Sequence, residues 1–374
     1  MNPKLPDSFR TIVGDLPPPG RLPEDAGGPF ETIRPAREAC IEREGVRCWY
    51  AVWGNAGPWL AFASPFQMVH SQLLKATVPY LSEHFRVITT DARGNGRSDR
   101  PASPDAYSFD HYVADFVAVL DAVGADRVAL IGISAAAMTV LRVAAVQPER
   151  VTHVVVAGGF AETLASDAAE AARARAERER VLADWPAYIE EFIASIFTEP
   201  HSTKPFEDGV RYGWATSAET IVHARKGWGG KDVRDLARRV RCPTLVLHGD
   251  DDRRVPHAKG VAIHELVPGS RMLTIGAGGH VPVVRDPVLF NRRVREFVAP
   301  GGPRRATWTR AMSRRRKALF VSSPIGLGHV QRDLAIAREL RRLEPELEVD
   351  WFTTDPARRY LEAEGERLPP LTRR

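Results

Sequence analysis

A serine lies between two apolar runs in the segment Ile131-Gly-Ile-Ser-Ala-Ala136. The run before Ser134 is typical of a strand and the run after it of a helix, so Ser134 is expected on a tight strand-to-helix turn. Small residues two positions before and after it, Gly132 and Ala136, allow such a turn to close. The turn exposes the serine oxygen and directs the next backbone N–H, that of Ala135, toward an oxyanion. The segment predicts a nucleophile; the alternative is an ordinary serine in a turn.

A serine nucleophile needs a base to take its proton and a third group to orient that base. His280 ends the glycine-rich segment 276–280 after an apolar run, where packing has little need of an imidazole. Three acidic candidates, Asp250, Asp251 and Asp252, follow His248-Gly at the end of another apolar run. We interpret His248 as a strand-end residue rather than a catalytic one.

Short apolar runs alternate with helical patterns, which is typical of βαβ units and a parallel sheet. The expected strands cover 46–53, 59–63, 86–90, 127–131, 151–156, 243–248 and 271–275, and the longer helices 107–123, 135–146 and 287–297. Between about residues 160 and 239 the pattern is helical throughout. Such an insertion in an α/β sheet predicts a lid over a site.

These ordered motifs resemble the α/β-hydrolase superfamily over about residues 45–300. The resemblance includes Asp91-Ala-Arg-Gly-Asn-Gly-Arg-Ser98, which is similar to the family's D-x-R-G-x-G-x-S loop after the fourth strand. It implies an α/β fold with a mostly parallel sheet, helices on both faces and a helical cap.

The same resemblance assigns roles to the candidate residues. In the family pattern H-G-x-x-D the acid is Asp252, so Asp250 and Asp251 are loop carboxylates. Ser134, Asp252 and His280 then follow the chain order of this fold class. Dehalogenases and epoxide hydrolases of the fold carry Asp at the nucleophile position. Ser134 instead implies acyl transfer on an ester, thioester, lactone or carbon–carbon bond.

The chain departs from the family pattern where an oxyanion donor is expected. The family usually has His-Gly and a bulky residue after the third strand, and here Ser64-Pro65 precedes Phe66. This alignment makes the backbone N–H of Phe66 one donor and that of Ala135 the second. A register different by one residue would place Pro65 at the donor position, and proline has no N–H. Losing one such donor costs about 10²–10³ in rate.

Aromatic residues in the predicted lid include Trp185, Phe192 and Trp214. They indicate a pocket for a largely apolar acyl or alcohol group, although aromatic residues in helices often belong to the hydrophobic core. No metal or organic cofactor is expected.

Composition places the chain among ordinary globular proteins, since 44% of its 374 residues are apolar and 26% are charged. The net charge of +5 arises after residue 300, where sixteen Lys and Arg outnumber ten Asp and Glu. Because no basic face interleaved with aromatic residues accompanies this charge, we expect no nucleic-acid partner. Cys40, Cys48 and Cys242 do not form a disulfide framework and are expected as buried or partly buried thiols.

No signal-like or membrane-spanning apolar run is found, so a cytoplasmic protein is expected.

The sequence divides into five parts. We expect an irregular arm over 1–37, a hydrolase core over 38–159 and 240–300, a helical cap over 160–239, a basic linker over 301–316, and a short βα segment over 317–374.

Residues 317–368 resemble the start of a GT-B glycosyltransferase, with a Gly-rich loop that contains Gly326, Gly328 and His329. The resemblance implies close approach of a ligand to a helix N-terminus, and makes His329 the counterpart of an acceptor-activating base. About fifty residues supply only the first two βα units of such an enzyme. We therefore expect a Rossmann-like fragment, too small for a stable core of its own.

The function expected from these residues is that of a serine hydrolase. It would cleave a carboxylic ester or related acyl bond of a small, largely apolar substrate through an acyl-enzyme. One alternative is a non-catalytic protein of the same fold that binds a ligand or partner. Another is the hydrolase module of a hydrolase–glycosyltransferase fusion.

Overall fold

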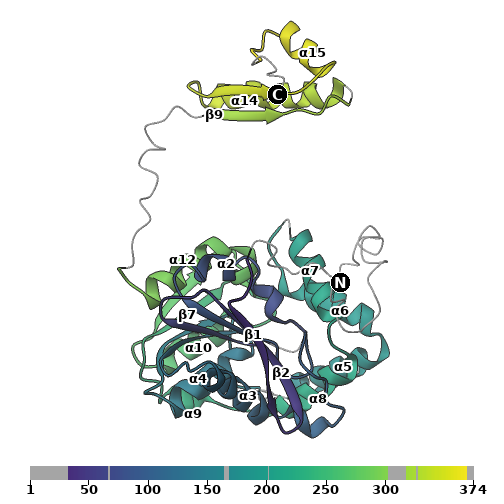
Figure 1. Ribbon diagram of the computed structural model, residues 1–374. Helices are drawn as coiled ribbons and strands as arrows, with labels where there is room; N and C mark the ends of the chain where they lie inside the picture. The colour runs from purple at the N-terminus through teal and green to yellow at the C-terminus, as the bar shows by residue number, and fades with distance from the viewer. Residues whose placement is uncertain are drawn as a thin grey trace. The chain divides into compact units, whose positions relative to one another are not determined.

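The computed structural model describes residues 33–65, 68–163, 168–200, 202–301, 317–325 and 327–368. The chain divides into two compact units, Met1–Pro300 and Gly301–Arg374. Within the described residues, the first unit is built on an eight-stranded sheet (Figure 1).

The sheet is parallel over most of its width. Its strands, in spatial order, are β1 (Arg37–Arg43), β2 (Val46–Trp53), β4 (Arg86–Thr90), β3 (Trp59–Ala63), β5 (Val128–Ile133), β6 (Val151–Ala157), β7 (Thr244–Gly249) and β8 (Arg271–Ile275). Strand β2 pairs antiparallel with both β1 and β4, and each following pair, from β4–β3 to β7–β8, is parallel. The expected α/β fold with a mostly parallel sheet is confirmed.

Strand β5 shows how the sheet divides the core, because successive side chains of a strand point to opposite faces. Val128 and Leu130 belong to one hydrophobic cluster, and Ala129 and Ile131 belong to the other. All six residues of β5 are buried, as expected for a parallel strand covered on both sides.

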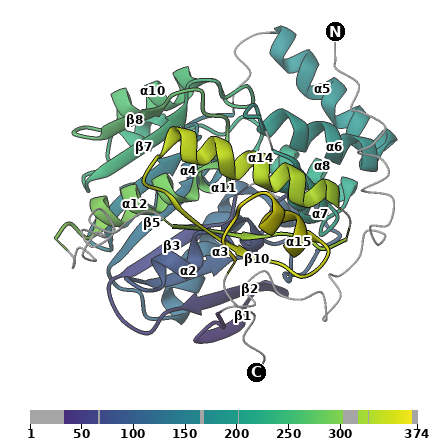
Figure 2. The same cartoon turned by 90° about the horizontal axis from the view of Figure 1, so that it is seen from above.

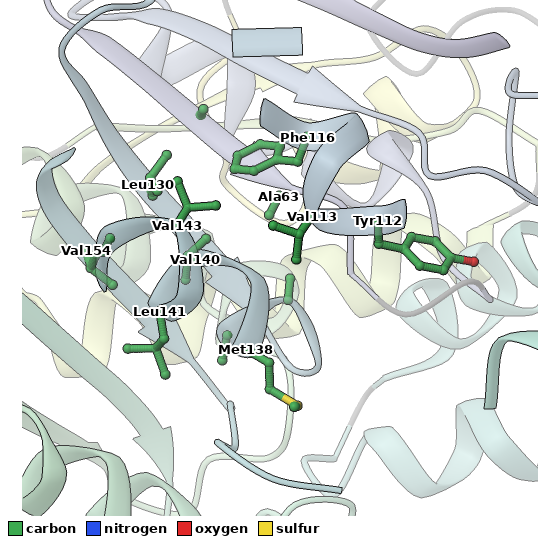
Figure 3. Packing of buried hydrophobic residues seen from close by; sticks show 14 of the residues in the cluster. Ala63, Tyr112, Val113, Phe116, Leu130, Met138, Val140, Leu141, Val143 and Val154 are labelled. Atoms are coloured by element: carbon green, nitrogen blue, oxygen red, sulfur yellow. The ribbon is translucent and has the colours of Figure 1, made fainter. Parts of the chain in front are cut away.

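Helices cover both faces of the sheet. The first cluster takes in α3 (Phe109–Ala122), α4 (Ala136–Val146) and α10 (His257–Leu266), and the second takes in α2 (Val78–Leu81) and α12 (Pro287–Val298). Figure 3 shows side chains of α3, α4, β5 and β6 in the first cluster. Shorter elements are η1 (Ser71–Leu74), η2 (Pro104–Tyr107) and α11 (Pro282–Arg285).

A helical insertion joins β6 to β7. It contains α5 (Ala168–Ala183), α6 (Trp185–Ile196), α7 (Thr203–Gly213), α8 (Ala218–Trp228) and α9 (Arg234–Ala237). Figures 1 and 2 both show α5 to α8 gathered on one side of the unit. Helix α6 begins at Trp185 because the Asp184 side chain accepts the Ala187 N–H and proline occupies the first turn. Its buried side chains recur every three or four residues from Trp185 to Ile196, so one face packs inward.

The loop after β4 is held by hydrogen bonds of a buried carboxylate. Asp91 Oδ1 accepts the Ser71 N–H at 2.8 Å, and its Oδ2 accepts the Arg97 N–H at 3.0 Å. Ser98 Oγ donates to the Asp91 carbonyl at 2.6 Å. The polar residues of the D-x-R-G-x-G-x-S motif therefore shape this loop and fix η1 beside it.

A buried ion pair joins the same loop to α3. Arg93 donates from Nε and Nη2 to the two oxygens of Asp115, at 2.6 and 2.8 Å. Its guanidinium side chain is 1% exposed and the Asp115 side chain 9%. Two parallel bonds between planar groups give this pair a fixed geometry.

The second unit has the order β9 (Lys317–Val321), α14 (Leu327–Leu343), β10 (Glu348–Phe352) and α15 (Ala357–Ala363), with β9 and β10 parallel. It has a small hydrophobic cluster of its own, centred on Trp351, whose indole N–H donates to Glu366 at 2.8 Å. The two expected βα units are present, and six buried apolar residues pack between them.

The Gly-rich loop expected at the start of this unit differs from the structure. Gly326 lies outside the described residues, while Gly328 and His329 are exposed in the first turn of α14 rather than in a loop. Val330 and Leu334 are the first buried residues of α14. The helix extends one short turn before them, so it begins earlier than the apolar periodicity indicated.

The cysteines are free thiols, with one difference from expectation. Cys48 is buried and Cys242 is partly buried, but Cys40 is exposed because it lies on β1, an edge strand with most residues open to solvent. Burial raises the pKa of the Cys242 thiol to about 11.

No helix in the described part of the chain is long and apolar enough to cross a bilayer.

We predict that Asp115→Ala lowers the free energy of unfolding by about 3–5 kcal/mol, because it leaves the Arg93 charge buried without its partner. Urea unfolding followed by circular dichroism measures the loss. The matched control is Asp121→Ala, whose carboxylate pairs with Arg150 but is 63% exposed. It should cost less than about 1 kcal/mol. Equal losses in the two variants would contradict the assigned role of the buried pair.

Candidate active site

Ser134 occupies the turn between β5 and α4 in a strained backbone conformation. Its φ is +54°, in the left-handed region that non-glycine residues seldom adopt. A Cβ on Gly132 would lie 2.6 Å from the carbonyl oxygen of Ala136, so the turn requires glycine at that position. Ala136 itself is fully buried and is accommodated in the first turn of α4. The departure from glycine at this second position leaves the turn intact.

Three side chains from the ends of three parallel strands form one hydrogen-bonded chain. His280 Nε2 lies 2.9 Å from Ser134 Oγ, and His280 Nδ1 lies 2.8 Å from Asp252 Oδ2. Ser134 follows β5, Asp252 follows β7 and His280 follows β8. With the Nδ1 proton donated to the carboxylate, the Nε2 lone pair is available to accept the serine proton. The structure thus brings together the three residues predicted from the sequence.

The carboxylate of Asp252 is buried and fully occupied by N–H donors. Its Oδ1 accepts the backbone N–H groups of Arg254 at 2.9 Å and Val255 at 2.8 Å. Burial opposes ionisation, but hydrogen bonds from His248, His280 and Val255 outweigh it and hold the pKa of Asp252 well below its usual range. An ionised carboxylate beside Nδ1 fixes the tautomer of His280 and favours its cation.

The neighbouring acids lie outside this chain of bonds. The Asp251 carboxylate faces the exposed guanidinium of Arg253, with N–O distances of 3.2 Å. Asp250 is exposed. The two therefore behave as the loop carboxylates expected from the resemblance.

His248 takes part in the site, which sequence reasoning missed. It lies one residue before the end of β7, close to where it was expected. It is also completely buried, with Nε2 2.9 Å from the Val255 carbonyl and 3.2 Å from Asp252 Oδ2. The Nε2–H group of His248 thus faces both the Asp252 carboxylate and the Val255 carbonyl in the loop after it. The spacing of four residues between His248 and Asp252 was the available signal, but it does not show that the chain turns back between them.

The structure describes one of the two expected oxyanion donors. Ala135 lies directly before α4, next to the nucleophile, and is 5% exposed. Phe66 lies outside the described residues. Ser64 Oγ accepts the Ala92 N–H at 3.2 Å, so the residue that replaces the family's histidine links the ends of β3 and β4.

An apolar cavity opens onto Ser134 and His280. It encloses about 650 Å³, part of it open to solvent. Its wall combines residues from the core with residues from α6, α7 and the segment between them, among them Met68, Leu73, Phe192, Ile196, Phe197 and Val284. Two charged residues, Lys75 and Asp208, also line it and form an ion pair, and Lys204 Nζ lies 2.7 Å from the other Asp208 oxygen. The cavity suits an apolar group attached to a reacting carbonyl.

Of the three lid aromatics expected in the pocket, Phe192 lines the cavity and Trp185 and Trp214 do not. Trp185 shares the inward face of α6 with Phe192 but lies seven residues earlier, about 10 Å along the helix axis. Its ring stacks on Tyr188 at 6.1 Å between centroids. Trp214 directly follows the last residue of α7 and packs against the second core cluster. The assignment of these two tryptophans to the pocket was wrong.

Comparisons with known proteins give the family of this chain. Residues 70–287 match the family model described as alpha/beta hydrolase fold. The chain is 30% identical over 233 residues to 2-hydroxy-6-oxo-2,4-heptadienoate hydrolase of Pseudomonas putida, covering 60% of this chain and 82% of that protein. It is 28% identical over 265 residues to 3-oxoadipate enol-lactonase 2 of Acinetobacter baylyi, covering 68% of this chain and 94% of that protein.

Solved structures show the same similarity. A hydrolase from Pseudomonas aeruginosa superposes with a TM-score of 0.63 at 25% identity, over 71% of this chain and 99% of that one. A bromoperoxidase from Bacillus anthracis has a TM-score of 0.64 at 23% identity, over 70% and 99% of the two chains, and shares the fold. This chain belongs to the α/β-hydrolase family. It is an enzyme, a hydrolase of the esterase and lactonase kind.

We predict that Asp252→Asn lowers turnover by about 10⁴-fold, because an amide at this position holds His280 in the wrong tautomer. Steady-state hydrolysis of a p-nitrophenyl ester measures the effect, and circular dichroism checks that the variant is folded. Asp250→Asn and Asp251→Asn are the matched controls and should stay within about threefold of the wild type. Comparable losses at all three positions would contradict the assignment of the acid.

Proposed function

We propose that the protein is a serine hydrolase that cleaves a carboxylic ester, or a related acyl bond, of a small and largely apolar substrate through an acyl-enzyme. The observation that carries the proposal is the bonded chain Ser134–His280–Asp252 at the opening of an apolar cavity. The three free cysteines fit a cytoplasmic location, since a reducing compartment keeps thiols reduced.

In the first half of the reaction Ser134 Oγ attacks the acyl carbon while His280 Nε2 takes the hydroxyl proton. The carbonyl π bond opens and its electron pair moves to the oxygen, forming a tetrahedral oxyanion. When this collapses, the bond to the leaving alcohol breaks and His280 returns the proton to the alcohol oxygen. Asp252 stabilises the imidazolium throughout without itself being protonated.

In the second half a water molecule takes the place of the alcohol. His280 removes a proton from the water, the resulting hydroxide attacks the acyl-enzyme, and His280 then protonates Ser134 as the acid leaves. The N–H of Ala135 is one oxyanion donor in both halves, and the N–H of Phe66 is proposed as the second. The cavity wall, with Phe192 and Ile196, holds the apolar acyl group.

We predict that p-nitrophenyl esters are hydrolysed and that a fluorophosphonate probe labels the wild-type protein once per chain, at Ser134. Ser134→Ala removes the nucleophile and should abolish labelling and lower turnover by about 10⁶-fold. Mass spectrometry of the labelled peptide and initial rates measure the two effects. A folded wild-type protein that neither reacts with the probe nor hydrolyses any ester would instead support a non-catalytic binding protein.

The second unit is proposed as a partial Rossmann-like module, related to the start of a GT-B glycosyltransferase, that takes no part in hydrolysis. The β9–α14–β10–α15 order with parallel strands supports a relation to a Rossmann-like half. All residues assigned to hydrolysis lie in the first unit, and the family match ends at residue 287.

We predict that deletion of residues 301–374 leaves ester turnover within about twofold and the melting temperature of the hydrolase unit nearly unchanged, because two compact units with separate cores unfold largely independently. Differential scanning calorimetry and initial rates provide the measurement. Loss of folding or of activity on deletion would show that the second unit is part of the hydrolase.

A further inference from the structure

The end of α6 and the residues that follow it are hydrogen-bonded to the segment that carries His280. The Ile196 carbonyl accepts the backbone N–H of His280 at 3.2 Å, and Glu199 Oε1 accepts the N–H of Gly279 at 2.8 Å. The Pro200 carbonyl accepts Arg285 Nη2 at 2.9 Å. We call this set of bonds between residues 196–200 and 279–285 the clasp. It joins the helical insertion to the loop of the catalytic base.

Glu199 is the side chain at the centre of the clasp. It is 14% exposed, and its second oxygen accepts the Thr198 N–H at 3.2 Å and lies 3.8 Å from Arg285 Nε. A Cβ on Gly279 would come within 2.8 Å of both Glu199 Oε2 and Thr198 Oγ1. The two segments therefore approach this closely because residue 279 is glycine. A bond from a backbone N–H to a carboxylate is roughly twice as strong as one between neutral groups.

The clasp is also a wall of the acyl cavity. Ile196 and Phe197 line the cavity from the insertion, and His280, Val281 and Val284 line it from the other segment. Ile196 thus does two things at once, since its side chain faces the cavity and its carbonyl holds the backbone of His280. An acyl group that packs against this wall contacts the segment that positions the base.

We propose that Glu199 is a positioning residue for His280, and that an acyl group filling the cavity tightens the clasp and so improves the alignment of the base with Ser134. The inference rests on the proposed hydrolase function. Its physical basis is that proton transfer depends on sub-ångström placement of the base, so ordering the loop raises the rate of the chemical step. Acyl length then acts on kcat through the clasp, in addition to its effect on KM through burial of apolar surface.

The experiment compares Glu199→Ala, Glu199→Gln and the wild type on p-nitrophenyl esters from acetate to octanoate. Glu191→Ala is the matched control, because Glu191 lies on α6 but is exposed and pairs with Arg180. Each kcat is expressed per active site titrated with the fluorophosphonate probe. In the wild type and Glu191→Ala, kcat should rise with acyl length until the cavity is filled.

In Glu199→Ala this rise should disappear, with kcat about 10- to 100-fold lower for the longer esters and KM within about twofold. Glu199→Gln keeps an oxygen acceptor for the Gly279 N–H and should restore most of the kcat. Amide hydrogen exchange of the peptide that contains Gly279 and His280 should be faster in Glu199→Ala than in the wild type.

A merely structural role of Glu199 would give a different result. The titrated fraction of active sites would fall while kcat per site and its dependence on acyl length stayed as in the wild type, and that outcome overturns the proposal. A uniform loss of kcat for all esters overturns the coupling to the acyl group. Failure of the proposed function is distinguishable, because the wild-type protein itself would then neither react with the probe nor turn over any ester.

Discussion

The ionised carboxylate of Asp252 is the point on which the geometry of the site depends. A buried charge is costly unless donors surround it, and here two backbone N–H groups and two imidazoles supply them. Those donors fix the direction of the carboxylate, which in turn fixes the tautomer of His280 and leaves its Nε2 facing Ser134. The site therefore requires the ends of β5, β7 and β8 to lie at one edge of the sheet, as parallel strands provide.

The helical insertion contributes more than a cover for this edge. It supplies Phe192, Ile196 and Phe197 to the cavity wall and also acceptors for the backbone around His280. One residue, Ile196, belongs to both sets, since it lines the cavity and its carbonyl accepts the backbone N–H of His280. A change at Ile196 would therefore alter the cavity wall and the support of the His280 backbone together.

The sequence predicted the parallel sheet and the tight turn at Ser134 because both leave local signals. Alternating strands and helices indicate the sheet, and Gly132 marks the tight turn at Ser134. The choice of Asp252 among three adjacent acids came from the family resemblance, as no local feature separates them. Contacts between distant segments were missed: the bond from Glu199 to the Gly279 N–H spans 80 positions of sequence. Trp185 was misplaced because helical spacing gives the face of a residue but not how far along that face the cavity extends.

The left-handed backbone of Ser134 has a consequence beyond catalysis. A non-glycine residue in this region is less stable than glycine by about 1–2 kcal/mol, and the fold keeps that cost in every molecule whether or not substrate is present. A glycine at position 134 would relieve this strain, but it would also remove the hydroxyl that lies 2.9 Å from His280 Nε2. At this position the stability of the fold and the presence of a hydroxyl that faces His280 therefore oppose each other.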